Sequence, residues 1–450
     1  MNKTKTKNIV KPLRGFNDWF SADVKPRQFV TDTFKQTFEK YGYEPLETPA
    51  LEYTKNILNL SGSEAEKQFY RFKDPGGRDV MLKYEVMIGM CRAVASNINK
   101  LSFPYKRYQI QPVWRAENTQ KGRYRQFTQC DADTIGTSSM VADAEFIQMG
   151  IEIIKKLGFK KFVVRINNRK ILSGLQQYLN IPPSKFYGMC MSIDKLNKIG
   201  VDGVKKELSG KRKLKPSQIE KIFKTIDTKA YKNLTNQEII DQLTPTIGST
   251  EIGAQGLDEL SQIFDYLALS KIPLSLYRFD TSLARGLASY TGPVWEFEVI
   301  DGNVGSIAGC GRYDNVIGKY LNQQDIIPAT GGSFGIERIC DIIKDQNIFT
   351  TDQNIASTLV TIFSNEFANQ SITAANLLRK NNIKTLLYPQ ADKLNKQFKY
   401  ANKKSIPFVV VIGPDEAKNN TVTVKNMLSG QQKTVTVNQL ISLLAPETKN

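Results

Sequence analysis

The chain has no histidine anywhere in its 450 residues. Without an imidazole it cannot form histidine metal sites, Ser-His-Asp triads or histidine general bases. Cysteine is also scarce. The five residues are scattered, odd in number and never spaced as CxxC. This pattern favours reduced thiols in a cytoplasmic protein and argues against a zinc knuckle, so we predict no metal-ligating set in the chain.

Long apolar runs are missing as well. No segment approaches the roughly 20 consecutive apolar residues of a membrane-spanning helix. The N-terminus, MNKTKTKNIVK, is basic, but no apolar stretch follows it as in a secretory signal. We therefore expect a protein that neither spans a membrane nor carries a secretory signal.

Acidic residues are outnumbered, with 62 Lys and Arg against 44 Asp and Glu and a formal net charge of +18. Such an excess favours a polyanionic partner through counterion release. A Lys-rich bias spread over a solvated surface would give the same total, so charge alone leaves both interpretations open. The length exceeds what one hydrophobic core normally supports, which predicts two or three domains.

The first half of the chain predicts a helix followed by a long hairpin. Residues 26–41 place Val30, Phe34 and Phe38 on one stripe, which is typical of an amphipathic helix. Residues 106–115 and 126–135 have the pattern of strands, and the polar, basic segment ENTQKGRYR lies between them. Two strands joined by a long basic loop indicate an antiparallel hairpin with a functional loop.

The later part of the chain changes character twice. Residues 191–268 are rich in Lys, Ile and Leu at helical spacing, which predicts a helical insertion. Strand patterns resume at 273–280 and 293–300, and 331–345 has the pattern of a strand turning into a helix. From residue 355 to 450 we predict a small α/β domain with mainly parallel pairing, because strand and helix patterns alternate there.

The densest cluster of chemically active residues lies in the hairpin. Arginines bind phosphate oxygens bidentately, so several of them on a flexible loop suit a triphosphate or a nucleic-acid backbone. A solvated basic loop would explain the same run taken alone. The cluster consists of Arg115, Glu117, Lys121, Arg123 and Arg125, with Phe127 beside it as a surface on which a base could stack.

Two glycine-rich segments follow. The first contains Arg285 and, five residues later, Tyr290. Glycines on both sides of Tyr290 permit close approach of a ligand. The segment GGSFG precedes Glu337 and Arg338. It fits neither GxGxxG nor GxxxxGK[ST], which argues against a Rossmann or P-loop enzyme.

Taken in order, these segments resemble the histidyl-tRNA synthetase family over nearly the whole chain. Each segment is degenerate by itself, and their order and spacing carry the resemblance. The matching segments are LRGFNDWF, the helix and extended segment ending at Pro49 (motif 1), VWRAENTQKGRYRQFTQCDADTIG (motif 2), SLARGLASYTGPVWEFEV with AGCGRYDNVIG, GGSFGIERI (motif 3) and KLNKQFKYANKKSIPFVVVIG.

The resemblance implies a role for each matching residue around ATP. Arg115 would hold the α-phosphate and the substrate carboxylate. Glu117 would meet the edge of the adenine, and Phe127 would stack on it. Arg123 and Arg338 would hold the distal phosphates. Mg²⁺ would accompany the nucleotide, as in other phosphoryl-transfer chemistry.

The amino-acid pocket is implied in the same way. Glu85 and Gln129 would take the α-amino group, while Asp133 and Tyr290 would read the imidazole. Arg285 would stabilise charge at the α-phosphate during carboxylate attack. The full set implied for the amino acid is Glu85, Met87, Gln129, Asp133, Arg285, Ser289, Tyr290 and Tyr313.

The same resemblance implies the partners and the fold. The partners would be histidine, ATP and tRNA(His), with Gln120 of the motif 2 loop facing the acceptor stem, and the chain would form a homodimer. The implied fold is α+β, with an antiparallel class II sheet. It would comprise a catalytic core in two parts, residues 1–190 and 269–348, a helical insertion at 191–268, and an α/β anticodon-binding domain at 355–450.

The sequence departs from the family where selectivity is decided. The family usually reads RGLDYYT, but Ala288 and Ser289 replace its Asp and Tyr, and Met87 stands where Thr is usual. Lineage drift with local compensation explains these changes, and altered amino-acid selectivity is the sharper alternative. A non-catalytic regulatory paralogue of the same fold is the other alternative. Retention of the motif arginines and of the C-terminal domain argues against it.

Overall fold

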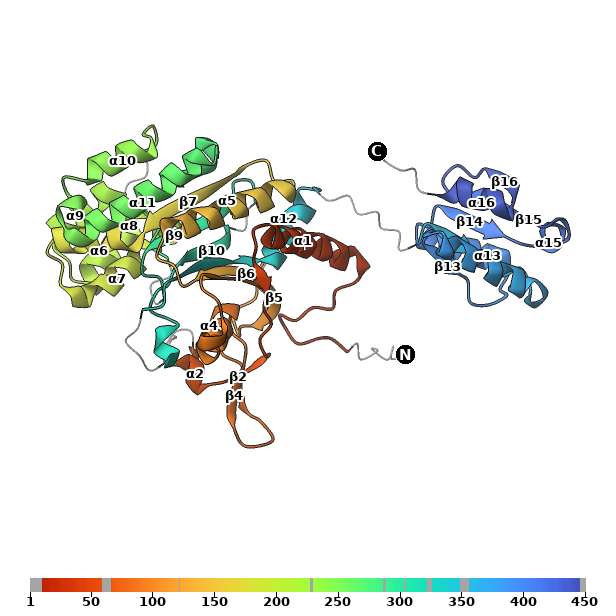
Figure 1. Ribbon diagram of the computed structural model, residues 1–450, viewed down its shortest axis with the longest axis horizontal. Coiled ribbons are helices and arrows are strands. Elements are labelled where there is room, and N and C mark those ends of the chain that lie inside the picture. The colour runs from red at the N-terminus through yellow and green to blue at the C-terminus, as the bar shows by residue number, and fades with distance from the viewer. Residues whose placement is uncertain are drawn as a thin grey trace, which may run out of the picture. The chain divides into compact units, whose positions relative to one another are not determined.

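The largest element is an eight-stranded sheet in the N-terminal unit of the chain (Figure 1). The computed structural model describes residues 10–58, 66–120, 122–226, 230–285, 289–302, 305–321, 326–348 and 356–445. Contacts within the chain divide it into two units, Met1–Phe349 and Thr350–Asn450. In sheet order the strands are β1 (Glu44–Pro45), β5 (Tyr105–Trp114), β6 (Gln126–Ile135), β11 (Ala329–Gly335), β10 (Ser306–Arg312), β9 (Pro293–Val299), β7 (Phe162–Asn168) and β8 (Tyr277–Phe279).

The six inner strands are antiparallel, as predicted, while each edge strand pairs in parallel with its neighbour. The strands at 106–115 and 126–135 are confirmed as the hairpin β5–β6. The strand expected at 273–280 is shorter, because residues Leu274–Leu276 form a 3₁₀ turn after Pro273 and only β8 pairs. Proline has no N–H to donate to a ladder, which explains the delayed start of the strand.

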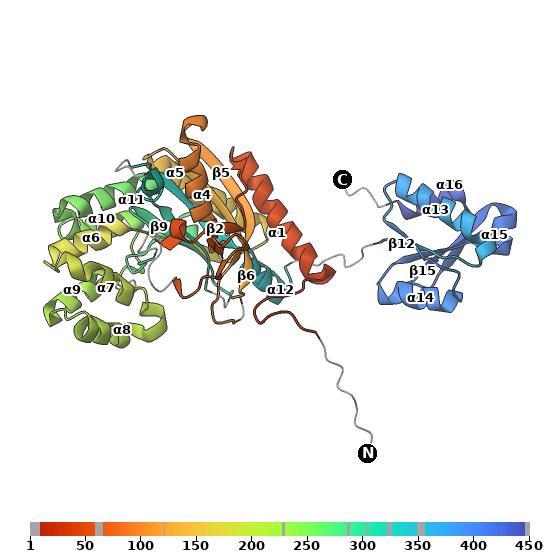
Figure 2. The same cartoon turned by 90° about the horizontal axis from the view of Figure 1, so that it is seen from below.

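Helices cover one face of this sheet. Figure 1 shows α1 (Ser21–Lys40), α5 (Met140–Lys156) and α12 (Ile336–Asp345) together on that side. The helix predicted at residues 26–41 begins five residues earlier in the structure, at Ser21, and Pro26 lies inside it. Seen from below in Figure 2, α4 (Val86–Ser96) and the small sheet of β2 (Leu51–Tyr53), β4 (Asp79–Leu82) and β3 (Arg71–Lys73) lie toward the viewer, on the other face. The short helix α2 (Lys55–Leu58) follows β2.

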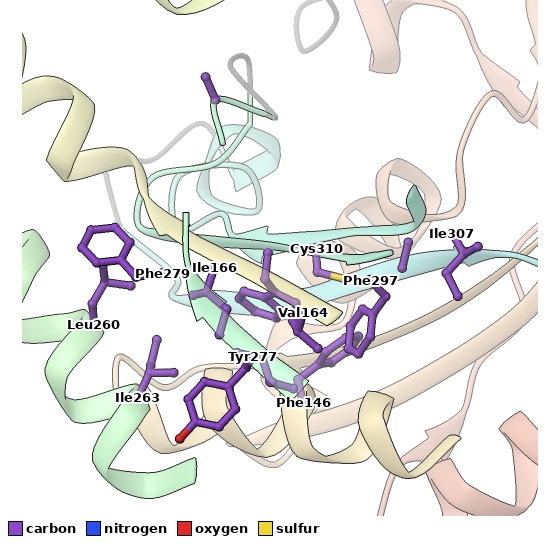
Figure 3. Packing of buried hydrophobic residues seen from close by; sticks show 14 of the residues in the cluster. Phe146, Val164, Ile166, Leu260, Ile263, Tyr277, Phe279, Phe297, Ile307 and Cys310 are labelled. Atoms are coloured by element: carbon purple, nitrogen blue, oxygen red, sulfur yellow. The ribbon is translucent and has the colours of Figure 1, made fainter. Parts of the chain in front are cut away.

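Aromatic side chains fill the space between the sheet and its helices. Phe334 of β11 lies 4.9 Å from Phe34 of α1 and 5.1 Å from Phe297 of β9, measured between ring centroids. Figure 3 shows Phe146 of α5 close to Phe297 in the same cluster. Full burial of each such side chain stabilises the fold by about 1.5–3 kcal/mol. Apolar packing therefore occupies the helix-covered face of the sheet, and polar side chains can occupy the opposite face.

A group of helices separates β7 from β8. It begins at Arg169, upstream of the insertion start predicted at residue 191. Its last helix packs against β7 and β8, where Figure 3 shows Leu260 and Ile263 facing the two strands. The helices are α6 (Arg169–Tyr178), α7 (Pro183–Ile193), α8 (Leu196–Lys206), the π-helical turn Glu207–Lys211, α9 (Pro216–Ile226), α10 (Asn236–Leu243) and α11 (Glu251–Leu269).

The C-terminal unit is a five-stranded sheet with helices. The alternation of strands and helices is as predicted up to β14, but the pairing is only half parallel. The strands after β14 form a hairpin that turns at Gly430, whose φ of +74° suits glycine. In sheet order the strands are β13 (Thr385–Leu387), β12 (Thr358–Val360), β14 (Phe408–Val411), β15 (Thr421–Asn426) and β16 (Gln432–Thr436); the helices are α13 (Ala368–Lys380), α14 (Leu394–Lys403), α15 (Pro414–Asn419) and α16 (Val437–Leu444).

No helix in the described ranges is both long and apolar enough to cross a bilayer.

Candidate functional site

Strand β6 separates polar from apolar side chains by simple alternation. Gln129, Asp131 and Asp133 line a cavity on the face of the sheet that carries α4. Cys130 and Ala132, between them, are buried in the core beneath the helices. Because side chains of a strand alternate between its two faces, one ten-residue strand supplies both the core and the site.

The neighbouring strands extend this polar face sideways. Asp131 is paired with Gln109 of β5 and Ser333 of β11, and Asp133 with Arg107 and Gly331. A Cβ on Gly331 would collide with the Asp133 carboxylate, and one on Gly311 of β10 would lie 3.0 Å from the Tyr290 ring. The glycines of β10 and β11 therefore leave room above the middle of the sheet, and this explains the glycine-rich segments of the sequence.

The space above these glycines is a cavity of about 420 Å³. It brings together residues that are far apart in the sequence and that come from α4, the hairpin, the segment before β9, β10 and β11. The expected site residues that line it are Glu85, Met87, Arg115, Glu117, Arg123, Phe127, Gln129, Asp133, Arg285, Ser289, Tyr290, Tyr313 and Arg338.

Gln120 and Arg125, which the sequence also singled out, are not among the residues that line this cavity. Gln120 is exposed and lines an adjoining cavity of about 290 Å³, which shares Arg123, Arg285 and Arg338 with the first cavity. Lys121 and Ala288 lie outside the described residues.

Arg115 is fixed in a slot at one side of the cavity. Its guanidinium lies 4.4 Å from the centroid of the Tyr84 ring and 5.2 Å from that of Phe127. Its Nε donates to the Tyr84 carbonyl oxygen at 3.1 Å, and its terminal nitrogens lie 3.9 Å from Glu85 and 4.0 Å from Glu117. Stacking and ion pairing together hold the planar group in one orientation, ready for an anionic ligand.

Further arginines converge on the same side. Arg338 donates from Nη1 to the Ser306 carbonyl oxygen at 2.6 Å. Burial lowers the pKa of Arg338, and the like charges of Arg123, Arg285 and Arg115 lower it further, with Glu117 opposing them. Guanidinium groups that repel one another in a shared cavity fit a ligand with several negative charges.

Acidic and phenolic side chains also line the cavity. Asp133 forms a buried ion pair with Arg107 and accepts a hydrogen bond from the Tyr313 hydroxyl. Burial raises the pKa of Asp133, while Arg107 and Tyr313 oppose that rise. Tyr290 lines the cavity as well, and burial raises the pKa of its hydroxyl well above the usual value, so it remains a neutral donor.

Sequence reasoning missed three residues of the site. Asp131 and Ser333 line the cavity floor, and the two-residue alternation through Gln129 and Asp133 was the signal that could have identified Asp131. Glu337 was noted only as a neighbour of Arg338. Its carboxylate accepts the backbone N–H of Thr128 at 3.0 Å and pairs with Arg27 of α1 at 2.8 Å, so it ties the hairpin to two helices.

Comparison with known proteins accounts for both units. The family model described as Histidyl-tRNA synthetase matches residues 15–339, and the one described as Anticodon binding domain matches residues 357–446. The chain belongs to the histidyl-tRNA synthetase family. The resemblance drawn from the sequence motifs is thereby confirmed, together with the expected fold class.

Individual members of the family support this assignment. A protein from Clostridium tetani named Histidine--tRNA ligase is 37% identical, covering 97% of this chain and 99% of its own. One of the same name from Cytophaga hutchinsonii is 35% identical, covering 96% and 98%. The crystal structure of histidyl-tRNA synthetase from Nostoc sp. PCC 7120 is 29% identical with a TM-score of 0.83, covering 97% and 99%. The family is one of enzymes, and these names do not favour either alternative considered above.

Proposed function

We propose that this chain ligates histidine to its cognate tRNA through an aminoacyl-adenylate. One observation carries the proposal: a single cavity combines a cluster of arginines with a buried carboxylate and two tyrosines. The arginines fit the phosphates of ATP, and the acidic and phenolic side chains fit an amino acid with a cationic amino group and an imidazole. The names of the relatives point to the same amino acid.

ATP would occupy the arginine side. Arg115 would bind the α-phosphate, with Phe127 stacked on the adenine and Glu117 at its edge. Arg123 and Arg338 would bind the distal phosphates. The mutual repulsion of these guanidinium groups supports this assignment, because a polyphosphate relieves it.

Histidine would bind at the acidic and phenolic side chains. Glu85 and Gln129 would bind its α-ammonium group, and Asp133 would accept an N–H of the imidazole beside Tyr290 and Tyr313. Two carboxylates and a neutral tyrosine suit a ligand that presents several N–H donors. Met87 and Ser289, which depart from the family pattern, line the same cavity and would shape its wall without adding charge.

The chemistry would depend on positioning and on charge. The histidine carboxylate attacks the α-phosphorus and pyrophosphate leaves. The tRNA ribose hydroxyl then attacks the acyl carbon, AMP leaves as the ester forms, and the hydroxyl proton is lost. Arg285, which forms an ion pair with Glu296 at the cavity wall, would stabilise charge at the α-phosphate. A carboxylate is already a nucleophile, so the first step requires no base from the protein, which agrees with the absence of histidine.

Magnesium would arrive with the nucleotide. Mg²⁺ prefers oxygen ligands and commonly bridges substrate phosphates rather than occupying a cage made only of protein. Across the ranges that the structure describes, no group of three or more acidic or cysteine side chains could hold an ion by itself. The ion would neutralise charge on the leaving pyrophosphate.

The tRNA would contact both units. Gln120, exposed beside the cavity, would face the acceptor stem, and the C-terminal unit would bind the anticodon. We also propose the domain division 1–190, 191–268, 269–348 and 355–450, assembly as a homodimer and a cytoplasmic location. The net charge of +18 supports a nucleic-acid partner.

ATP–pyrophosphate exchange measured with each amino acid tests the proposal. We expect histidine alone to stimulate exchange, and Arg285→Gln to lower the rate roughly 100-fold or more, because it removes one transition-state cation. Arg278→Gln, which alters an exposed arginine of β8, is the matched control and should leave exchange unchanged. Exchange stimulated by another amino acid would revive the altered-selectivity alternative, and no exchange at all would contradict the proposal.

A further inference from the structure

Asp131 lies at the centre of the cavity floor with one oxygen unused. Its side chain is 3% exposed, and its Oδ1 has no hydrogen-bond partner among the residues described. Gln109, directly opposite on β5, likewise has a buried Oε1 without a partner in that part of the chain. Buried acceptors without donors are costly, and each one in a folded protein calls for an explanation.

A missing cation in the cavity would explain the free oxygen of Asp131, which lines it. Asp133 has Arg107 as its ion-pair partner and accepts a hydrogen bond from the Tyr313 hydroxyl. Its Oδ2 and three Arg107 nitrogens have no hydrogen-bond partner among the residues described. Ser333, on the other side of Asp131, accepts a hydrogen bond from Gln129 at 2.9 Å, which leaves its hydroxyl hydrogen to donate to Asp131. Where Asp131 lines the cavity, its Oδ1 is therefore an acceptor without a donor among the residues described.

We propose that Asp131 binds the α-ammonium group of the amino-acid substrate, as a third acceptor beside Glu85 and Gln129. This inference rests on the proposed function. An ammonium group has three N–H donors. Glu85 and Gln129 satisfy two of them, and Met87, the remaining neighbour at the start of α4, offers no oxygen. Asp131 follows Gln129 by two residues on the same strand face, so its free oxygen is placed to accept the third.

Binding at Asp131 is coupled to a proton. Burial raises the pKa of Asp131 to about 7; Arg107 and the Ser333 hydroxyl oppose this rise, and Asp133 and Glu85 add to it. The free cavity therefore holds Asp131 partly protonated at neutral pH. The substrate ammonium favours the carboxylate, so binding expels that proton to solvent, and affinity rises as the pH rises through 7.

The charged and titratable groups that face Asp131 come from every element packed around it. They are Arg107 on β5, Asp133 on β6, Glu85 before α4 and Lys83 after β4, while the thiols of Cys130 on β6 and Cys310 on β10 lie behind it in the core. Burial lowers the pKa of Lys83 to about 8 and raises those of the two thiols well above their usual value. Since the chain has no histidine, no imidazole of the protein titrates near pH 7 to obscure the signal.

The test compares the full-length protein with its Asp131→Asn variant, in which the amide imitates the neutral acid. Histidine binding is measured by titration calorimetry from pH 6 to 8. At pH 8 we expect the variant to bind histidine roughly tenfold more weakly, as for loss of a charge-assisted hydrogen bond. Near pH 6 the affinities of the two proteins for histidine should converge. Asp131 is then mostly protonated in the free wild type, and the amide of the variant imitates that protonated acid. Cys130→Ser, on the other face of β6, should follow the wild type.

A second ligand assigns the contact to the ammonium group. 3-(Imidazol-4-yl)propionate lacks only that group, and we expect it to bind wild type and variant alike at every pH. In wild type alone at pH 7, histidine should release about half a proton more than this analogue, after correction for the titration of each free ligand. This measurement holds even if the variant does not fold.

Three results would overturn the inference: equal affinities of wild type and variant for histidine at pH 8, a difference that does not depend on pH, or equal proton release by the two ligands. Failure of the proposed function itself looks different. It would appear as wild-type protein that shows no histidine-dependent pyrophosphate exchange, whereas failure of this inference alone leaves that exchange intact.

Discussion

The pair formed by Arg107 and Asp133 is the most deeply buried charge pair of the site. Arg107 is fully inaccessible and Asp133 is 2% exposed. Such a pair costs desolvation energy, and its two members stabilise the fold only together. Within it, the Arg107 guanidinium opposes the rise that burial causes in the pKa of the Asp133 carboxyl.

Replacement of Arg107 by methionine should therefore destabilise the N-terminal unit strongly. Removing one partner of a buried pair costs about 3–5 kcal/mol, because the other charge is left unpaired. Urea unfolding of full-length protein measures the loss. Arg71→Met is the matched control, since Arg71 pairs with Asp79 in solvent and its loss should change the midpoint little. Equal shifts for the two variants would contradict the argument.

Single residues of the site could be predicted from the sequence where they lie in a recognisable motif. Arg115, Arg285 and Arg338 were expected from their motifs, and all three line the cavity. Arg107 and Asp131 were not, because a charged residue within a strand pattern reads as solvent-facing. Only the pairing of β5 with β6 and the cover provided by α4 bury them.

Strand β11 shows how an element is shaped by what it must leave free. Its glycines at 331 and 332 face, respectively, Asp133 and the Cys310 side chain, and neither position has room for a Cβ. Gly335, at the end of the same strand, has nothing closer than the flexible Arg338 side chain at 3.9 Å. The glycines at 331 and 332 thus provide clearance for neighbouring atoms, whereas Gly335 does not.

Gly331→Ala should consequently affect amino-acid binding more than ATP binding. The added methyl group would collide with the Asp133 carboxylate and with the Ala132 carbonyl oxygen, and overpacking of this kind costs about 1–3 kcal/mol. We expect the KM for histidine in pyrophosphate exchange to rise roughly tenfold, with the KM for ATP little changed. Gly335→Ala should leave the KM for histidine unchanged. An increase confined to the KM for ATP would show that the clearance serves another purpose.

Elements with strong local patterns were predicted best. The strands of the hairpin β5–β6 match their expected bounds within one residue, because long runs of one period are unambiguous. The short edge strands β1 and β8 were not foreseen as parallel partners. Their pairing is fixed by chain segments far away in sequence, and two or three residues carry no period.

At the scale of the whole molecule, the two units have separate cores. The hydrophobic cluster of the sheet in Met1–Phe349 and those of Thr350–Asn450 share no residue. Units with their own cores can fold separately.

A fragment of residues 1–349 should therefore retain histidine-dependent pyrophosphate exchange. Transfer of histidine to tRNA should fall roughly 100-fold, because the fragment loses the second of two linked binding modules. Exchange and aminoacylation measured on the same preparation give both values, and the full chain is the reference. A fragment that aminoacylates as well as the full chain would contradict the role given to the C-terminal unit.

Order and spacing of the motifs predicted the family, although no single motif did. The mixed pairing of the C-terminal sheet was not predicted, because alternating strands and helices favour parallel pairing until a hairpin such as β15–β16 follows. The net positive charge was compatible with a polyanionic partner and with a solvated Lys-rich surface, and it did not distinguish the two.

The alternation along β6 has one last consequence, which concerns assembly of the sheet. A slip of one residue between β5 and β6 would turn Asp131 and Asp133 into the apolar core beneath α1, and Cys130 and Ala132 into the cavity. Carboxylates without partners in that core would cost several kcal/mol each. A chain that misaligns this hairpin would thus lose both stability and the charged lining of the cavity. The carboxylates of the cavity therefore favour the native register between β5 and β6.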